Sequence, residues 1–478
     1  MRDRATQWLG TFATLCGLWF ASVAAGAPPA KDRTPLGLHP DNPHYFVFRG
    51  KPAILITSAE HYGAVLNRDF DYGKYLDEIH AHGLNLTRTF TGAYCEDTKS
   101  FGIARNTLAP AEGKLICPWA RADVPGYAGG GNKFDLSKWD TEYFRRLKDF
   151  LDKASERGVV VELNLFCPFY EDSMWRLSPM NAANNVNDVG KLPRQAVYDL
   201  RKNGELQKVQ ESMVEKLVIE LNRYDNLYYE VCNEPYFGGV TDEWQRRMVD
   251  VIVAAEKPLA NKHLISVNVA NGSKRIENPH AAVSIFNFHY ASPPDAVAAN
   301  FALNKVIGDN ETGFKGTADF HYRMEAWEFV LAGGGLYNNL DYSFAVGSED
   351  GSFKFPAKSP GGGGRDLRQQ MKVLKDFIHG FDFVRMSPDG GVVKGGLPPK
   401  GRARALSEVG KQYAVYLHGG PDARLSLALP GGRYKAEWVS PASGQVLKAE
   451  QVTAAASVTE LPSPKFEVDI ALRVIRAE

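Results

Sequence analysis

The feature that most constrains the fold is a repeat of short apolar runs between about residues 45 and 382. Eight runs occur: AILITSAEHYG (53–63), LNLTRTF (84–90), VVVELNLFC (159–167), NLYYEVCNEP (226–235), LISVNVANG (264–272), VSIFNFHY (283–290), KVIGDNETG (305–313) and GGGLYNNLDYSF (333–344). Between them lie segments such as YGKYLDEIHAHG (72–83) and YFRRLKDFLDKASERG (143–158), whose apolar residues are three and four apart. This spacing is typical of helices, and apolar strands linked by helices form a parallel sheet.

Eight strand and helix units over this length predict an α/β fold, the closed (β/α)8 TIM barrel. An open doubly wound sheet is the alternative, but it usually has fewer strands and a glycine-rich phosphate turn after the first strand. Neither GxGxxG nor GxxxxGK[ST] follows the first run. The barrel is therefore the favoured fold.

The character of the chain changes after the helical segment DLRQQMKVLKDFIHGF (366–381). From there, short runs such as QYAVYLH and RLSLALP alternate with glycine and proline turns, which predicts a small antiparallel β-sandwich. We therefore expect a barrel domain at 34–382 and a C-terminal β-sandwich domain at 390–478.

The N-terminus has the three parts of an export signal: two arginines, an apolar stretch from about residue 8 to 20, and the small residues ASVAAGA. We expect a signal peptide at 1–25 and a periplasmic or secreted protein without a membrane segment after cleavage. An uncleaved anchor and a lipid anchor at Cys16 are the alternatives. After cleavage, Cys95, Cys117, Cys167 and Cys232 remain and would be exposed to an oxidising compartment. Four cysteines allow three pairings into disulfides, and the sequence does not choose among these pairings.

The charge of the chain is balanced, with 56 basic and 56 acidic side chains and no long run of either sign. This balance argues against nucleic acid or an anionic membrane as a partner and favours a neutral molecule. No CxxC or HxH spacing occurs, so we expect no metal and no cofactor.

Two glutamates stand at the ends of predicted strands. Glu234 ends the fourth run in CNEP, and Glu311 ends the seventh in GDNETG. Strand ends on the C-terminal face of a barrel point into one shared bowl, so these two carboxyl groups can face each other. Such a pair can break a glycosidic bond, one group protonating the leaving oxygen while the other attacks the sugar or activates water. Taken singly, each is better explained as an ordinary exposed acid in a loop.

The motif Asn233-Glu234-Pro235 after an apolar strand, with Glu311 three strands later, resembles the clan A glycoside hydrolases, and in particular the cellulase-like family five barrels. The resemblance covers about residues 45–382. It implies that Glu234 is the acid/base and Glu311 the nucleophile of a retaining enzyme. It also implies that Arg88, at the end of the second run, keeps the nucleophile ionised, while Asn233 is suited to bind the sugar 2-hydroxyl.

The sequence departs from this family at two places. His289 and Tyr290 end the sixth run, where family five usually has His-x-Tyr, so the role of Tyr290 is open. His289 could bind a hydroxyl, orient Glu311 or only line the wall. The usual tryptophan of the eighth strand is also missing, and Tyr337 or Tyr342 could replace it. The C-terminal segment resembles the small β-domain, often named collagen-binding, that follows such barrels.

Two long segments, 91–142 and 167–206, follow the second and third runs. Loops at this face of a barrel build its sites. Their aromatic residues could stack on sugar faces or simply hold the loops together. Trp119, Tyr170 and Trp175 are the first candidates for stacking.

Other acidic residues near the run ends have weaker assignments. Glu60 and His61, at the end of the first run, could line a sugar subsite or be structural. Asp309 is a rival nucleophile, because it lies on the same strand face as Glu311. Glu230 would lie deeper in the barrel, where an unpaired carboxylate is costly, so we expect it to pair with the arginine of the second run or a buried water.

These observations predict an exported retaining glycoside hydrolase that acts on an oligo- or polysaccharide. The alternative is a non-catalytic carbohydrate-binding or surface adhesion protein on a barrel scaffold, because one fold hosts many functions. A pure binder has no need for both glutamates beside an arginine. The sugar, the linkage, endo or exo action and the oligomeric state are left open.

Overall fold

The barrel predicted from the sequence is confirmed. A computed structural model describes residues 33–455 and 458–477, and the predicted signal peptide at 1–25 lies outside them. Eight parallel strands pair in the order β4-β13-β12-β11-β10-β9-β8-β5. They are β4 (Leu55–Ala59), β5 (Leu86–Phe90), β8 (Val160–Phe166), β9 (Leu227–Cys232), β10 (Ile265–Asn271), β11 (Val283–His289), β12 (Val306–Thr312) and β13 (Leu336–Leu340). Each strand lies within one of the eight apolar runs.

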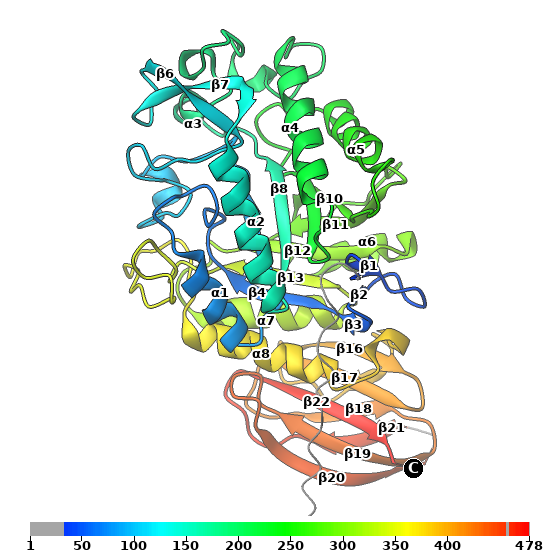
Figure 1. Cartoon of the computed structure of the whole chain (residues 1–478). Helices are drawn as coiled ribbons and strands as arrows, with labels where there is room; N and C mark the ends of the chain where they lie inside the picture. The colour runs from blue at the N-terminus through cyan, green and yellow to red at the C-terminus, as the bar shows by residue number, and fades with distance from the viewer. Residues whose placement is uncertain (1–32, 456–457, 478) are drawn as a thin grey trace, which may run out of the picture. The chain divides into compact units, whose positions relative to one another are not determined.

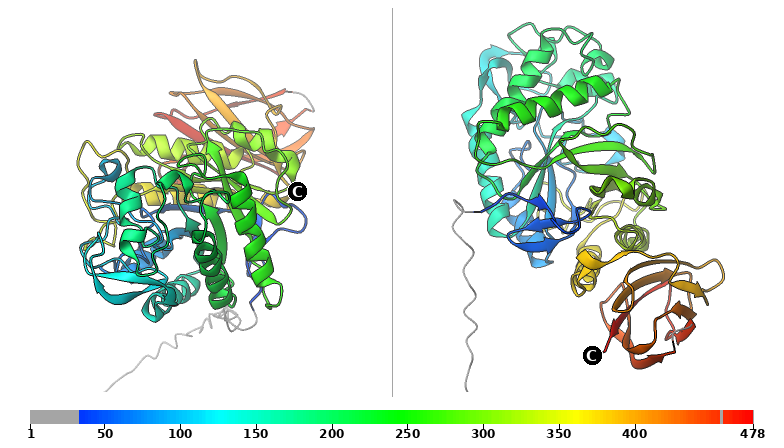
Figure 2. Two further views of the ribbon diagram at one scale, coloured as in Figure 1. Left: turned by 90° about the horizontal axis from the view of Figure 1, so that it is seen from above. Right: turned by 90° about the vertical axis from the view of Figure 1, so that its right-hand side faces the viewer.

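Helices surround this sheet (Figures 1 and 2). They are α1 (Tyr72–Ala81), α2 (Thr141–Glu156), α4 (Leu206–Leu221), α5 (Asp242–Glu256), α6 (Asp295–Asn300), α7 (Asp319–Leu331) and α8 (Arg365–His379). In α2, the Asp140 side chain accepts the backbone N–H groups of Glu142 and Tyr143, a typical N-cap. Residues 272–282, between β10 and β11, contain no helix, so one of the eight strand and helix units is incomplete.

The barrel closes at a seam between β4 and β5, which share no backbone ladder. The side chain of Asn85 takes the place of a peptide there. Its Nδ2 donates to the carbonyl of Ile54 (2.9 Å), and its Oδ1 accepts from the N–H of Ile56 (2.8 Å). These two backbone groups at the seam are thereby satisfied without a further strand pair.

A small antiparallel sheet, absent from the strands predicted from the sequence, covers the end of the barrel where its strands begin. It consists of β1 (Gly37–Leu38), β2 (Phe46–Phe48) and β3 (Lys51–Ala53). Leu36 and Phe46 join an apolar cluster with Leu55, Leu86 and residues at the starts of five more barrel strands. This layer excludes water from the end of the barrel opposite the carboxyl ends of its strands.

The two long loops are ordered and carry their own structure. The first contains the hairpin β6 (Trp119–Pro125) and β7 (Asn132–Trp139), and the second contains α3 (Asp172–Leu177). Trp119 and Trp175 are 0% and 6% exposed, and the indole of Trp175 donates to the carbonyl of Leu192 (2.9 Å). These two tryptophans hold the loops together. Cys95, Cys117, Cys167 and Cys232 are buried free thiols.

The C-terminal strands form two antiparallel sheets. The first pairs in the order β14-β16-β17-β22-β19-β20 and the second in the order β15-β18-β21. Their bounds are β14 (Ser387–Pro388), β15 (Val393–Gly395), β16 (Arg402–Glu408), β17 (Gln412–His418), β18 (Arg424–Ala428), β19 (Gly432–Val439), β20 (Val446–Ala454), β21 (Val458–Pro462) and β22 (Asp469–Arg476). Val415 and Trp438 of the first sheet and Leu425 and Leu461 of the second share one core, which makes the pair a sandwich.

The larger sheet contacts the barrel helices α7 and α8. Arg323 of α7 forms a two-bond ion pair with Asp469 of β22, each bond 2.9 Å long and both side chains buried. Trp327 stacks on Tyr416 with a centroid distance of 5.3 Å. A buried two-bond ion pair needs both partners in place, so it ties this sheet to the barrel.

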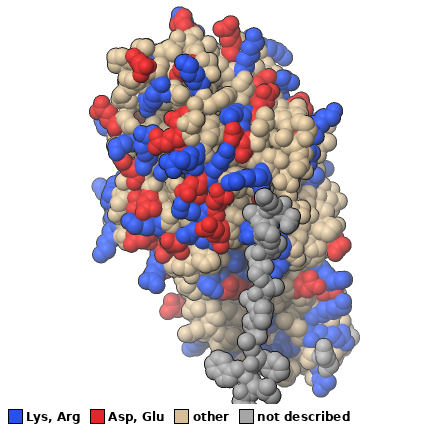
Figure 3. All heavy atoms as spheres, in the orientation of Figure 1, with Lys and Arg blue, Asp and Glu red and all other residues tan. Residues whose placement is uncertain are grey.

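Basic and acidic side chains are interspersed over the face shown in Figure 3. This mixture agrees with a sequence pI of about 7.2. Within residues 33–455 and 458–477, no helix is both long and apolar enough to cross a bilayer.

Candidate active site

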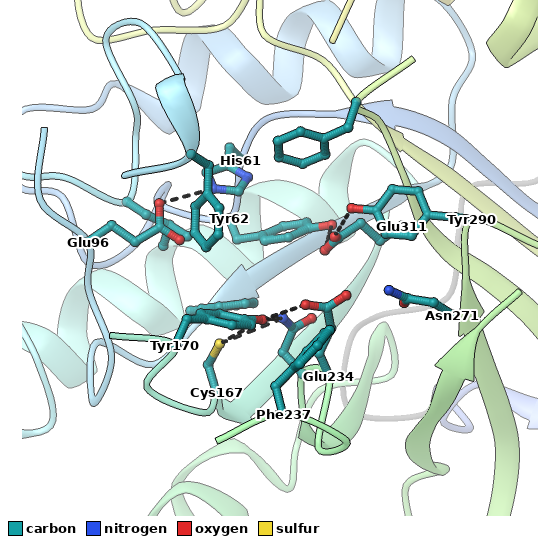
Figure 4. A pocket seen from close by; sticks show the side chains of 15 residues that line it. His61, Tyr62, Glu96, Cys167, Tyr170, Glu234, Phe237, Asn271, Tyr290 and Glu311 are labelled. Atoms are coloured by element: carbon teal, nitrogen blue, oxygen red, sulfur yellow. Dashed lines mark hydrogen bonds and ion pairs between the residues drawn. The ribbon is translucent and has the colours of Figure 1, made fainter. Parts of the chain in front are cut away.

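Glu234 and Glu311 lie on facing walls of one pocket of about 250 Å³ at the carboxyl ends of the barrel strands (Figure 4). Glu234 directly follows β9 and Glu311 belongs to β12, and the two residues are 8% and 6% exposed. One carboxylate oxygen of each and one ring nitrogen of His289 lie within 4.8 Å of one another. The strand ends thus bring together two carboxyl groups that are 77 positions apart in the sequence.

Four groups surround the carboxylate of Glu311. Tyr290 donates its hydroxyl to Oε1 (2.8 Å), and Tyr62 donates to Oε2 (3.0 Å). Arg88 Nη1 lies 3.3 Å from Oε2, and His289 Nδ1 lies 3.4 Å from Oε1. Burial alone would raise the pKa of Glu311, but His289, Arg88 and Tyr290 outweigh it and hold that pKa well below its usual range. The group is therefore a carboxylate at neutral pH.

Glu234 has a different set of partners. Tyr170 donates its hydroxyl to Oε2 (2.7 Å) and Tyr236 donates to Oε1 (3.2 Å). His289 Nδ1 lies 3.1 Å from the same Oε1. Burial would lower the pKa of His289, but Glu311 and Glu234 together raise it to about 10. A proton on Nδ1 therefore lies within hydrogen-bonding distance of Glu234.

Arg88 anchors the floor of the site, where it is 1% exposed. Its Nε donates to Glu162 (2.6 Å), and its Nη2 pairs with Glu230 and donates to Asn233 Oδ1 (2.7 Å). The pairing of Glu230 with this arginine is confirmed. Glu162 is the floor residue that the sequence analysis missed, although VVELNLF places it on β8 at the level of Arg88.

Glu162 is fully buried beside the carboxyl group of Glu230 and the guanidinium of Arg88. Burial raises its pKa to about 8, with the charge of Glu230 adding to the effect and Arg88 opposing it. Tyr228 and Asn310 also donate hydrogen bonds to it. At neutral pH, Glu162 is therefore a neutral acid that fills the floor without adding another negative charge.

Backbone strain is concentrated around the pocket. Of the eleven described non-glycine residues with positive φ, five line it: Tyr62, Phe101, Glu234, Tyr290 and Phe314. Such conformations cost about 1–3 kcal/mol each and cluster at functional sites. Their concentration here marks this pocket as the place where the chain gives up stability.

The conformation of Tyr290 explains the missing residue of the His-x-Tyr pattern. Successive side chains of a strand point to opposite faces, so Tyr290 should point away from His289. The strand ends at His289, however, and Tyr290 adopts φ +52°. This left-handed turn brings its hydroxyl to Glu311 although the intervening residue is absent.

Several predicted site residues lie outside the pocket. Glu60 is 0% exposed and accepts the N–H groups of Gly63 and Ala64 and the hydroxyl of Thr107, so its position fits the structural alternative. Asp309 is 1% exposed and does not line the pocket, and burial raises its pKa well above the usual range. A buried neutral acid does not fit the role of a rival nucleophile.

The stacking role expected for Trp119 and Trp175 does not fit the structure either. Neither lines the pocket, and neither has a ring face free for a sugar. Tyr170 does line it, but its hydroxyl is bound to Glu234. The aromatic residues that line the pocket with exposed rings are Phe101, Phe237 and Phe314, which are 42–44% exposed.

These phenylalanines were missed because no periodic pattern marks them. Phe101 lies in a single 3-10 turn (Ser100–Gly102) within the first long loop, Phe237 lies in the loop after β9, and Phe314 follows β12 two residues after its end. The ring of Phe101 contacts Tyr170 and Phe314, with centroid distances of 5.3 and 6.3 Å. Phe314 in turn contacts Tyr342 (6.3 Å), so the tyrosine expected at the eighth strand supports a phenylalanine at the wall.

His61 and Glu96 form a pair at one end of the pocket (Figure 4). His61 Nε2 lies 3.4 Å from Glu96 Oε2, and Tyr94 donates its hydroxyl to Glu96 Oε1 (3.0 Å). Both members are buried, at 8% and 4% exposure. His61 therefore lines the pocket, as its place at the end of the first run suggested. Glu96 lines it too, but no pattern in its long loop marked it as a site residue.

Glu234, His289 and Glu311 also have the spacing that could hold a metal ion. Among the described residues, this is the one group of acidic, histidine or cysteine side chains with that spacing. The same atoms hydrogen-bond one another, Tyr170 and Tyr290. Two carboxyl groups that face each other across a pocket are also what glycosidic bond cleavage requires.

The family model of the cellulases, glycosyl hydrolase family 5, matches residues 69–319, which is more than half of the chain. No curated protein matches the sequence. Among solved structures, a proposed glycoside hydrolase from Bacteroides vulgatus is similar with a TM-score of 0.66, at 13% identity over 94% of this chain and 83% of its own.

A family 5 glycoside hydrolase from the same organism gives a TM-score of 0.62, at 16% identity over 92% of this chain and 94% of its own. Identities this low show a shared fold. The similarity extends over the barrel and the C-terminal strands together.

Proposed function

The chain is a glycoside hydrolase of the cellulase family, glycosyl hydrolase family 5, and from this premise we propose that it cleaves O-glycosidic bonds of a glycan with retention of configuration. Glu311 is the proposed nucleophile and Glu234 the proposed acid/base. The observation that carries this assignment is the placement of one oxygen of each carboxylate within 4.8 Å. Retaining enzymes have carboxyl groups about 5–5.5 Å apart, whereas inverting enzymes need about 6.5–9.5 Å to admit a water.

The first step forms a covalent glycosyl-enzyme. A carboxylate oxygen of Glu311 attacks the anomeric carbon, while Glu234 gives its proton to the glycosidic oxygen, and the bond from that carbon to the leaving group breaks. His289 Nδ1, 3.1 Å from Glu234 Oε1, orients the carboxyl group of Glu234 for this proton transfer. Arg88 keeps Glu311 ionised for the attack.

The second step releases the sugar. Glu234, now a carboxylate, takes a proton from a water, and the water oxygen attacks the same anomeric carbon from the face that the leaving group vacated. The bond to Glu311 breaks and its carboxylate returns. Asn233 has its Oδ1 held by Arg88 and its Nδ2 by Tyr170 (2.9 Å), which supports its proposed role as the ligand of the 2-hydroxyl.

The remaining proposals concern organisation and substrate. We propose a barrel domain at 34–382, because α8 ends at His379, and a C-terminal β-sandwich domain whose start moves from the expected residue 390 to 387, because β14 begins at Ser387 and pairs in the larger sheet of the sandwich. The substrate is an oligo- or polysaccharide, as family membership implies, and the signal peptide predicted at 1–25 supports export. Phe101, Phe237 and Phe314 are the proposed stacking residues in place of the two tryptophans.

The test is hydrolysis of a panel of aryl glycosides and polysaccharides by the mature protein, compared with Glu234→Ala and Glu311→Ala. Azide is added to each variant, and the configuration of the product is determined by NMR. Azide with Glu234→Ala should give a glycosyl azide with the configuration of the substrate, and azide with Glu311→Ala the opposite one.

The two variants control for each other, because each lacks one carboxyl group of the same pocket. Equal activity of wild type and both variants would refute the assignment. An inert wild type that still binds a glycan would instead favour the non-catalytic carbohydrate-binding protein.

A further inference from the structure

The pocket that holds the two glutamates is closed at one end. The closed end is built by His61 and Glu96, with Leu108 beside them, and all three are buried. Behind the pair, Asn106 donates to Glu96, and the Thr107 hydroxyl lies between Glu60 Oε2 (2.6 Å) and the carbonyl of His61 (2.8 Å). No chain of sugars can continue through a wall that is sealed by buried, hydrogen-bonded side chains.

The opposite end of the pocket is open. Asn271, Tyr236 and Phe237 stand there, and all three are exposed. Tyr236 bonds to Asn271 and donates to Glu234 Oε1 (3.2 Å). The missing helix between β10 and β11 leaves a hollow of about 580 Å³ on the far side of Tyr236. A long substituent can therefore leave the pocket past Tyr236.

The contacts of the two glutamates assign the ends to the two sides of the scissile bond. Tyr170, which contacts Phe101 at the closed end, holds Oε2 of Glu234 (2.7 Å), whereas Oε1 lies 3.2 Å from Tyr236 of the open end. The more weakly held Oε1 therefore faces the leaving group on the open side. Glu311, the proposed nucleophile, contacts Tyr62, whose ring is 5.3 Å from that of His61. The sugar that Glu311 attacks then lies toward the closed end.

The closed end offers polar atoms to such a sugar. His61 Nδ1 is buried and has no partner in the protein, although His61 lines the pocket. A buried polar atom without a partner is costly unless a ligand satisfies it. Glu96 stands next to it as a charged acceptor. The volume of about 250 Å³ is below the usual range for drug-sized ligands, about 300–1,000 Å³, and suits one sugar ring.

The rim above this end is apolar. Phe101 and Phe314 contact each other, and both hold strained backbone conformations with φ of +54° and +53°. Strain at two contacting, exposed rings indicates that their positions serve a ligand. A sugar combines polar edges with apolar faces. His61 and Glu96 can bind the hydroxyls of one terminal sugar, and the rings of Phe101 and Phe314 can cover its apolar face.

We propose that the enzyme is exo-acting, and that it binds the non-reducing terminal sugar of its glycan in the closed end, where His61 and Glu96 hydrogen-bond the hydroxyls farthest from the scissile bond. The rest of the glycan leaves the pocket past Tyr236. This inference rests on the proposed function and adds to it the class of substrate, a terminal glycoside.

The first test identifies the initial products from para-nitrophenyl glycosides and biosides of glucose, mannose, galactose and xylose in both anomeric forms. An exo-acting enzyme with a one-sugar pocket should release a free monosaccharide and a para-nitrophenyl monoglycoside from a bioside, and free nitrophenol only after a lag. Immediate release of a disaccharide with nitrophenol would overturn the proposal, because two sugars would then fit beyond the scissile bond.

The second test assigns the hydroxyl contacts with deoxy analogues of the monoglycoside that is hydrolysed. Losing one hydroxyl should lower kcat/KM of the wild type by about 10- to 100-fold, as for a hydrogen bond to a charged group. In Glu96→Gln that penalty should fall to about threefold or less, while penalties at other hydroxyls stay. Glu112→Gln, an exposed acid of the same loop, is the matched control and should behave as wild type.

The outcomes separate this inference from the function on which it rests. If no glycoside or bioside is hydrolysed by the wild type, both the proposed function and the inference fail. If glycosides are hydrolysed but Glu96→Gln lowers kcat/KM equally for every deoxy analogue, the glycosidase function stands and the hydroxyl contacts are refuted.

Discussion

Replacing Arg88 with methionine tests how the barrel floor tolerates its acidic groups. The guanidinium lies at 1% exposure and contacts Glu162, Glu230 and Glu311. Methionine preserves much of the length and apolar volume of the arginine stem but removes the cation. Three buried carboxyl groups then lose a partner at once.

The size of the effect follows from general magnitudes. Removing one partner of a buried ion pair costs about 3–5 kcal/mol. The unfolding entropy is about 2.1 cal/mol/K per residue near 60 °C, or about 0.9 kcal/mol/K for the compact unit at residues 34–478. The Tm of Arg88→Met should therefore fall by about 3–5 °C if this unit unfolds cooperatively.

Catalysis should fall in the same variant. Glu311 loses a cation that lowers its pKa, and Asn233 loses the donor that holds its Oδ1. Hydrogen bonds to charged groups contribute about 1.5–3 kcal/mol each, so kcat/KM should fall by at least about 100-fold. The assays are thermal unfolding followed by circular dichroism and hydrolysis of the glycoside found by the panel.

Arg88→Lys is the control, since it keeps the charge and loses the planar fork. Its Tm should lie between those of the wild type and Arg88→Met. If Arg88→Met unfolds within about 1 °C of the wild type and retains its activity, the floor does not depend on this cation and the reasoning is refuted.

Three further variants test other parts of the account. Tyr290→Phe removes a hydrogen bond that lowers the pKa of Glu311, so the acidic limb of the pH profile of kcat/KM should move to higher pH and the maximum should fall about 10- to 100-fold; an unchanged acidic limb would contradict the contact. Glu162 has a folded-state pKa of about 8, above its unfolded value of about 4.3, and therefore opposes folding increasingly between about pH 4.5 and 8. The Tm of Glu162→Gln relative to wild type should rise across that window, whereas a constant difference would show that Glu162 is not protonated at neutral pH. Arg323→Ala leaves Asp469 buried without its partner, which should cost about 3–5 kcal/mol of stability and lower the Tm. Its kcat/KM at 25 °C should stay within about twofold of the wild type. A Tm equal to that of the wild type would show that the sheet contact is dispensable.

The strands and the two glutamates could be predicted because local pattern and strand-end position are sufficient for them. Each barrel strand coincides with an apolar run, and Glu234 and Glu311 meet because parallel strands end at one face. The small sheet β1–β3 was not predictable in this way, since its strands are only two or three residues long and acquire their role from packing under the barrel.

The loops account for most of what the sequence did not reveal. Trp119 and Trp175 look like sugar platforms in sequence, but burial decides their role and depends on how the loop folds. Phe101, Phe314 and Glu96 reach the pocket through loop geometry and positive φ, which carry no periodic signal. Tyr290 is intermediate, because its residue type was informative while its direction required the backbone turn.

The measurement that tests the central claim most directly is proton NMR of the anomer that forms first when the wild-type enzyme hydrolyses its glycoside. Carboxylate oxygens of Glu234 and Glu311 within 4.8 Å match the short carboxyl separation of retaining enzymes and not the wider gap of inverting ones, so the sugar should first appear with the anomeric configuration of the substrate and mutarotate later. A first product of inverted configuration would contradict the assignment of Glu311 as nucleophile and of Glu234 as acid/base.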